Sequence, residues 1–155
     1  MTARARSAGL LVHRRGPGGR REVLIAHMGG PFWAHREAGA WSIPKGEQGD
    51  GEEPLAAARR EFEEELGIPP PDGEPVALGE LRQPSGKHVA VWAIEADLDV
   101  RAFAPGTFEL EWPPRSGRVQ AFPEVDRVAW VDVETARGRL VRGQVPFLDR
   151  LEALA

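Results

Sequence analysis

The chain opens with two apolar runs that predict β-strands. These runs cover Ser7–His13 and Glu22–Met28, and a turn rich in glycine and proline joins them, as in a β-hairpin. Residues 29–40 show neither the strand nor the helix period and predict a loop. The next segment, Trp41–Lys45, is short and predicts a strand that leads into a glycine-rich loop.

The strongest signal is a helix that begins at Pro54 and ends before Gly67. Proline suits the first helical position because its missing N–H would have no partner there, and glycine accepts the left-handed conformation that ends a helix. At about 100° per residue, this segment presents two separate stripes. The apolar stripe is Leu55, Phe62 and Leu66, and the acidic stripe is Glu61, Glu64 and Glu65. We expect the apolar stripe to fix the helix against the core.

The second half of the chain returns to strand patterns and finishes with short helices. The prolines over residues 69–75 predict a surface loop. A second break, with Pro113, Pro114 and Gly117, follows the strand predicted over Thr107–Trp112. We predict strands over Val76–Gln83, His88–Asp97, Thr107–Trp112 and within Glu124–Asp132, and helices over Glu134–Arg139 and Val145–Ala155. This order is mixed α/β, although periodicity alone allows several α+β folds.

Composition narrows the class of protein. A chain of 155 residues is expected to form one domain over residues 1–155, with 41% apolar and 28% charged residues as in ordinary globular proteins. The sequence contains no cysteine, which excludes disulfides and thiolate metal sites, and no apolar run long enough to span a membrane. The net charge of −4 argues against a nucleic-acid polymer as partner. We therefore expect a cytoplasmic protein.

The acidic stripe is the first candidate for chemistry. Three carboxylates at i, i+3 and i+4 repel one another, at about 0.2–0.5 kcal/mol for each like-charge pair on an exposed helix. Bound Mg²⁺ or Mn²⁺ would remove this repulsion, because both cations prefer oxygen ligands. The alternative is that Glu61, Glu64 and Glu65 form only a solvated face.

The residues around the stripe resemble the signature of the Nudix hydrolase family, G-x5-E-x7-R-E-U-x-E-E-x-G-U, where U is a bulky aliphatic or aromatic residue. All nine fixed positions are filled, by Gly46, Glu52, Arg60, Glu61, Phe62, Glu64, Glu65, Gly67 and Ile68. The resemblance implies the Nudix α/β/α sandwich, with a curved mixed sheet between helices. It also implies metal-dependent hydrolysis of a pyrophosphate bond in a nucleoside diphosphate linked to another group.

The resemblance further implies roles for individual residues. Glu61, Glu64 and Glu65 would bind Mg²⁺ or Mn²⁺, with the Lys45 carbonyl oxygen and Glu124 completing the ligands. Glu124 matches a family glutamate six residues before a tryptophan of the last strand, which serves as ligand or as the base that activates water. Either Glu61 or Glu124 would be the general base. Glu52 would pair with Arg60 to brace the loop against the helix.

Four further residues are candidates for substrate contacts. Lys45, next to the metal loop, and Lys87, at the start of a predicted strand, would contact phosphate. Arg115 flanks the break near Pro113 and would bind an anionic group. Trp33, in the loop over residues 29–40, would either stack on a base or cap the core.

Substrate identity is ranked by these features. The Pro44-Lys45-Gly46 run resembles the diadenosine-polyphosphate hydrolase branch of the family, so a dinucleoside polyphosphate is the first choice. Nucleoside triphosphates come second, and ADP-ribose and nucleotide sugars third. The alternatives are a non-catalytic Nudix-fold domain that binds or senses nucleotides, and an acidic-helix interaction module. A sensor would be expected to lack some signature carboxylates, and this chain has them all.

Overall fold

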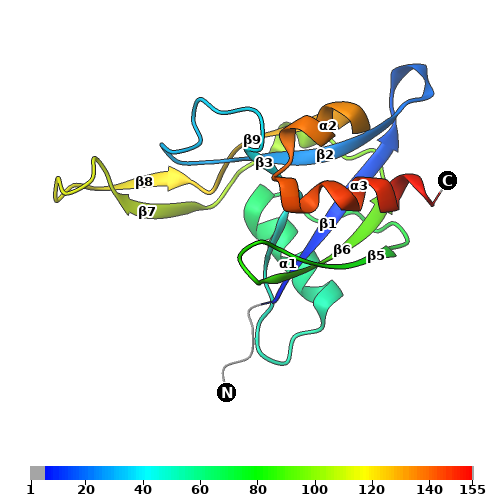
Figure 1. The fold of residues 1–155 in the computed structure, drawn as a ribbon, viewed down its shortest axis with the longest axis horizontal. Coiled ribbons are helices and arrows are strands. Elements are labelled where there is room, and N and C mark those ends of the chain that lie inside the picture. The colour runs from blue at the N-terminus through cyan, green and yellow to red at the C-terminus, as the bar shows by residue number, and fades with distance from the viewer. Residues whose placement is uncertain (1–5, 155) are drawn as a thin grey trace.

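Strand β1 (Arg6–Arg15) is buried along most of its length because both faces of the sheet that contains it are covered. Its alternating side chains belong to two different cores: Leu11 belongs to one core, whereas Leu10 and Val12 belong to the other. In this computed structural model, which describes residues 6–154, the two cores lie on opposite faces of one mixed sheet (Figure 1).

The sheet has seven strands and combines parallel with antiparallel pairing. The path β3-β2-β1-β6-β5 is extended by β4, which pairs with β1, and by β9, which pairs with β2. Strands β1 and β6 are parallel, and the other pairs are antiparallel. The strands are β2 (Arg21–Met28), β3 (Trp41–Ser42), β4 (Lys45–Glu47), β5 (Val76–Arg82), β6 (His88–Glu95) and β9 (Val125–Asp132).

Helices cover both faces of this sheet. Helix α1 (Pro54–Leu66) packs on one face through Phe62 and Leu66, as the apolar stripe predicted. Helices α2 (Val133–Arg139) and α3 (Val145–Glu152) pack on the other face (Figure 1). Three short 3-10 helices, η1 (Pro17–Gly19), η2 (Val100–Ala102) and η3 (Arg142–Gln144), lie in connections. The predicted α/β/α arrangement is therefore confirmed.

A second, two-stranded sheet projects away from the main sheet (Figure 1). It consists of β7 (Thr107–Glu111) and β8 (Val119–Pro123), which pair antiparallel, and is called the arm below. The sequence predicted β7 but not β8. The reason is physical, since residues 119–121 of β8 are exposed and carry no core-facing alternation that a sequence pattern could reveal.

Several predicted boundaries differ from the observed ones. The predicted strand Trp41–Lys45 is two short strands, β3 and β4, which lie on either side of Ile43 and Pro44. The last helix ends at Glu152, and the predicted end at Ala155 lies outside the described residues, as do residues 1–5 of the predicted domain. Within residues 6–154, no helix is both long and apolar enough to cross a membrane.

The end of α1 provides a test of the fold. Gly67 has a φ of 67°, and a Cβ there would collide with the Ala104 carbonyl oxygen, so Gly67→Ala should destabilise the protein by more than about 1–2 kcal/mol. Gly138→Ala is the matched control, because Gly138 is exposed within α2 and a Cβ there meets nothing within 4 Å. That change should stabilise by about 0.5–1 kcal/mol. Urea unfolding measures both, and equal effects would contradict this account.

Candidate active site

The signature glutamates are positioned by the apolar side of α1. Ala57, Ala58, Phe62 and Leu66 are buried, which fixes the rotation of the helix on the sheet. Pro54 occupies its first turn, and the Gly67 N–H donates to the Glu63 carbonyl oxygen at 2.7 Å. The helix bounds are those predicted from the sequence. The acidic stripe consequently faces the loop that precedes the helix.

The backbone at Lys45 and Gly46 lies directly against this stripe. The Lys45 N–H donates to Glu65 Oε2 at 3.3 Å. A side chain at Gly46 would collide with the carboxylate of Glu61, so only glycine permits this approach. Strand β4 holds the segment in place by pairing with β1, with Gly46 opposite Ala8. Two of the three glutamates of the acidic stripe, Glu61 and Glu65, are therefore adjacent to the backbone of Lys45 and Gly46.

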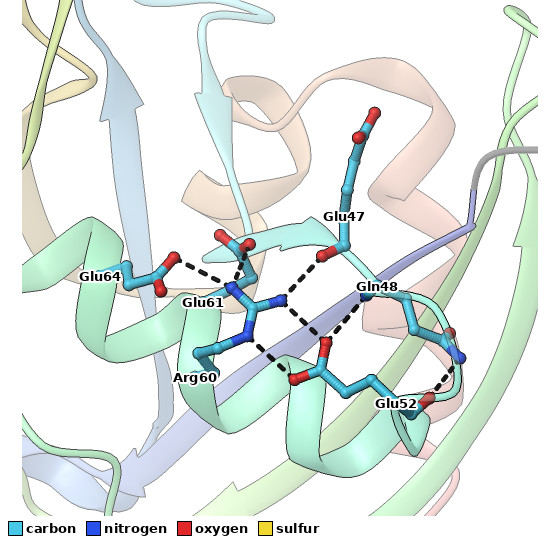
Figure 2. Close-up of polar contacts among 7 residues, drawn as sticks. Glu47, Gln48, Glu52, Arg60, Glu61 and Glu64 are labelled. Atoms are coloured by element: carbon cyan, nitrogen blue, oxygen red, sulfur yellow. Dashed lines mark hydrogen bonds and ion pairs between the residues drawn. The ribbon is translucent and has the colours of Figure 1, made fainter.

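Arg60 links the signature loop to the signature helix (Figure 2). Its guanidinium donates to both oxygens of Glu52 at 2.9 Å, to Glu61 at 2.9 Å and to Glu64 at 3.0 Å. A further N–H donates to the Glu47 carbonyl oxygen at 3.0 Å. The ion pair between Glu52 and Arg60 that the sequence predicted is present, and its geometry is bidentate.

The loop side of this ion pair is itself well ordered by hydrogen bonds. Glu52 Oε1 accepts from the Gly49 N–H at 2.9 Å, and the Gln48 side chain donates to the Glu52 carbonyl oxygen at 2.7 Å. The hydrogen bonds from Arg60, followed by that from Gly49, lower the pKa of Glu52 to about 2. Glu52 is therefore a carboxylate throughout the physiological range, and the loop is closed around a charged pair.

Glu65 has the most perturbed environment of the signature carboxylates. Burial raises its pKa to about 7, against the opposing effects of the Lys45 N–H and the Lys45 charge. The charges of Glu61 and Glu124 raise this pKa further. Because the charges of both residues act on the Glu65 carboxyl, the carboxylates of α1 and the carboxylate at the junction of β8 and β9 lie in one electrostatic environment.

Glu124 lies at that junction, where the arm meets β9. Its N–H donates to the Gly106 carbonyl oxygen at 2.9 Å, and its own carbonyl oxygen accepts from the Gly29 N–H at 2.9 Å. A Cβ on Gly106 would lie 3.5 Å from the Glu64 carbonyl oxygen and 3.7 Å from Glu124 Oε2. Gly106 thus brings the root of the arm close to α1, a feature that the sequence reasoning missed because this glycine lies outside the signature.

The candidate ligands suit a divalent metal ion by their chemistry. Glu61, Glu64, Glu65 and Glu124 offer only carboxylate oxygens, which suit Mg²⁺ or Mn²⁺. In the described part of the chain, no three acidic or histidine side chains converge as a metal cluster as they stand, and Arg60 is the cation that Glu61 and Glu64 contact. The chemistry of the donors fits, and the side chains would have to turn from Arg60 to bind metal.

The predicted substrate contacts are more scattered. Lys45 adjoins the carboxylates through its backbone. Lys87 is paired with Glu47 at 3.4 Å, one residue after Gly46. Trp33 packs against the core on the α2 and α3 side of the sheet, which is the core-capping alternative. Arg115, with a φ of 62°, lies at the tip of the arm, so the structure does not bring it to the carboxylates.

A cleft without signature residues lies elsewhere on the molecule. A space of about 600 Å³ at the free edge of β9 is lined by Trp41, Arg127 and Arg139 among others, and by none of the signature carboxylates. Glu37 bridges Arg127 and Trp41 there, at 2.8 and 3.1 Å. We place the candidate active site at the carboxylates, because cleft volume alone does not provide the groups that chemistry requires.

Comparison with known proteins identifies the family of this chain. The NUDIX domain model matches residues 3–151. A nucleoside triphosphate pyrophosphatase/Nudix hydrolase fusion protein of Bifidobacterium longum is 34% identical over 113 residues, which cover 70% of this chain and 23% of that protein. The chain thus spans about a quarter of the length of this curated relative.

Solved structures agree on the fold. A Caenorhabditis elegans Ap4A hydrolase, solved as a binary complex, has a TM-score of 0.66 and 22% identity, with 96% of each chain covered. The NUDIX domain of Shewanella oneidensis NrtR, complexed with ADP ribose, has a TM-score of 0.64 and 14% identity, covering 100% of this chain and 91% of that one. At these identities the likeness concerns the fold, and it is the family match together with the complete signature that shows that this chain belongs to the Nudix family.

Proposed function

We propose that this chain is a metal-dependent hydrolase that cleaves a pyrophosphate bond in a nucleoside diphosphate linked to a second group. The observation that carries the proposal is the acidic stripe of α1, which faces the backbone at Lys45 and Gly46. Glu61, Glu64, Glu65, Glu124 and the Lys45 carbonyl oxygen would hold Mg²⁺ or Mn²⁺. When bound, such a cation neutralises charge on phosphate oxygens and lowers the pKa of an attacking water.

The remaining roles belong to protein side chains. Arg60 and Glu52 position the loop that carries the Lys45 carbonyl oxygen. Glu61 already accepts a hydrogen bond from Arg60, whereas Glu124 is exposed at the junction of two strands. This difference favours Glu124 as the group that accepts a proton from water, with Glu61 as the alternative base. Lys45 and Lys87 would contact substrate phosphates.

For the substrate we propose a dinucleoside polyphosphate first and a nucleoside triphosphate second, with ADP-ribose and nucleotide sugars third. The Pro44-Lys45-Gly46 run and Glu124 support the first choice, and the fold similarity to an Ap4A hydrolase is consistent with it. The binding-only alternative draws on the NrtR domain, which was solved with ADP ribose. The complete set of signature carboxylates favours the enzyme. Chromatography of products from a nucleotide panel incubated with Mg²⁺ separates the two.

Metal dependence is the first test of this proposal. Activity should require Mg²⁺ or Mn²⁺ in the millimolar range, because the clustered carboxylates need a counter-cation to accept phosphate. Initial rates are measured with and without excess EDTA, and again after metal is restored. Full turnover in excess EDTA would rule out the proposed chemistry.

The second test concerns Arg60. Arg60→Ala should lower kcat/KM by about 10- to 100-fold and leave the protein folded, because the variant loses the link between loop and helix. Arg59→Ala is the matched control, since Arg59 neighbours Arg60 but donates to the Pro71 carbonyl oxygen at 3.1 Å. Circular dichroism monitors folding. Identical kinetics for the two variants would show that the Arg60 contacts do not contribute to activity.

The third test separates ligand from base. Glu64→Gln and Glu65→Gln should weaken Mn²⁺ affinity as well as turnover, whereas Glu124→Gln should lower kcat by about 10²–10⁴-fold with little change in KM. Each variant is titrated with Mn²⁺ and assayed at saturating metal. Glu63→Gln, an exposed neighbour on α1, is the control.

The outcomes of this titration assign the base. Rescue of Glu124→Gln by excess metal would make Glu124 a ligand only and Glu61 the base. Wild-type behaviour of Glu124→Gln would exclude Glu124 from the site. Glu109 or Glu111 of β7 would then be the next candidate for its role.

A further inference from the structure

An aromatic pair, of which Phe32 is exposed and Trp112 is partly buried, lies on the arm side of the molecule. Phe32 is 62% exposed, and no other phenylalanine or tryptophan among residues 6–154 is so open to solvent. Its ring contacts that of Trp112 edge to face, with centroids 5.3 Å apart. An exposed phenyl ring that packs edge to face against a second ring offers an aromatic surface on which a planar base can stack.

The arm is built to hold this pair. Phe108 and Leu110 of β7 alternate with Trp112, the residue that follows the strand, and so share one face, with Phe122 of β8 opposite Phe108 at 6.1 Å between centroids. Gly30, with a φ of 93°, lies over this face, and a Cβ there would be 3.0 Å from the Phe108 ring. The segment containing Phe32 is therefore fixed along the arm.

The aromatic face is continuous with the candidate active site. The arm begins at Gly106, which lies beside the Glu64 backbone and the Glu124 carboxylate, and it returns to Glu124 itself. Trp112 follows Gly106 by six residues, and at about 3.3 Å per residue this places it roughly 20 Å from the carboxylates along the strand. A ligand that reaches both places must be long.

The charges on the arm suit an anionic ligand. Glu109 and Glu111 alternate with the aromatic residues and so belong to the opposite face. The Trp112 N–H donates to the Arg118 carbonyl oxygen at 2.9 Å, which continues the pairing and places Arg118 on the aromatic face. This face therefore combines partly buried rings with a cation and excludes the nearby carboxylates.

We propose that Phe32 and Trp112 bind the second base of a dinucleoside polyphosphate whose phosphates lie at the signature carboxylates. Among the substrates considered above, only a dinucleoside polyphosphate has an aromatic base at both ends of a polyphosphate. The inference rests on the proposed function and specifies its substrate class. It replaces Trp33, which packs against the core, with Phe32 as the aromatic contact of the loop.

Kinetics with two substrates test this inference. Trp112→Ala and Phe32→Ala should raise KM for a dinucleoside tetraphosphate by roughly 5- to 100-fold, the loss expected for one stacked base, and leave kcat unchanged. The same variants should leave both constants for a nucleoside triphosphate unchanged, because that substrate has no second base. Trp112→Phe, which keeps a ring, should restore most of the affinity.

The control lies on the opposite face of the same arm. Val119 is 63% exposed and stands opposite Glu111, so Val119→Ala should change neither substrate's constants. Sedimentation velocity of each variant monitors association. An unchanged KM for the dinucleoside tetraphosphate, an equal rise for both substrates, or a rise accompanied by a changed oligomeric state would each overturn the inference.

The two proposals fail separately. If the wild type cleaves nucleoside triphosphates but not the dinucleoside tetraphosphate, the hydrolase proposal stands and the second-base inference is wrong. If it cleaves no nucleotide, the hydrolase proposal fails, and calorimetric titration of dinucleoside tetraphosphate with Mg²⁺ still decides the inference. Weaker binding to Trp112→Ala than to wild type supports the second-base site, whereas equal binding or none to both overturns it.

Discussion

The contacts of Arg60 determine how the signature loop and α1 meet. One guanidinium joins Glu52 and the Glu47 carbonyl oxygen of the loop to Glu61 and Glu64 of the helix. These groups are partly solvent-exposed, so each ion pair contributes little to global stability, and the bidentate geometry matters more than the charge. The free energy that holds α1 comes instead from its buried apolar side. Packing therefore fixes the helix, and Arg60 fixes the loop relative to it.

The same helix carries an arrangement that conflicts locally with stability. Three glutamates on one stripe repel each other, and Glu65 is in addition buried enough for its pKa to rise to about 7. Such local conflicts with stability are expected at functional sites and rare elsewhere. Arg60 relieves part of the conflict by contacting Glu61 and Glu64. A cation that displaces Arg60 from these carboxylates would thus replace one positive charge with another.

Sequence reasoning succeeded where the signal is local and failed where it is not. The bounds of α1 follow from Pro54, Gly67 and a helical period, all contained in one segment. The pairing of Arg60 with Glu52 followed from family resemblance, and the contact is present. Strand β8 was missed because its exposed residues have no core-facing pattern. The positions of Trp33 and Arg115 depend on contacts between distant segments, which no local pattern encodes.

The arm also bears on how the site works. A two-stranded sheet is marginally stable alone, and this one is secured at its root by the hydrogen bonds of Glu124 to Gly106 and Gly29. These are backbone bonds of the residue whose carboxylate belongs to the candidate site. Any ligand that holds the arm in one position therefore also holds Glu124. Because β9 continues directly from Glu124 into the main sheet, one of the two chain segments that join the arm to the main sheet passes through this residue.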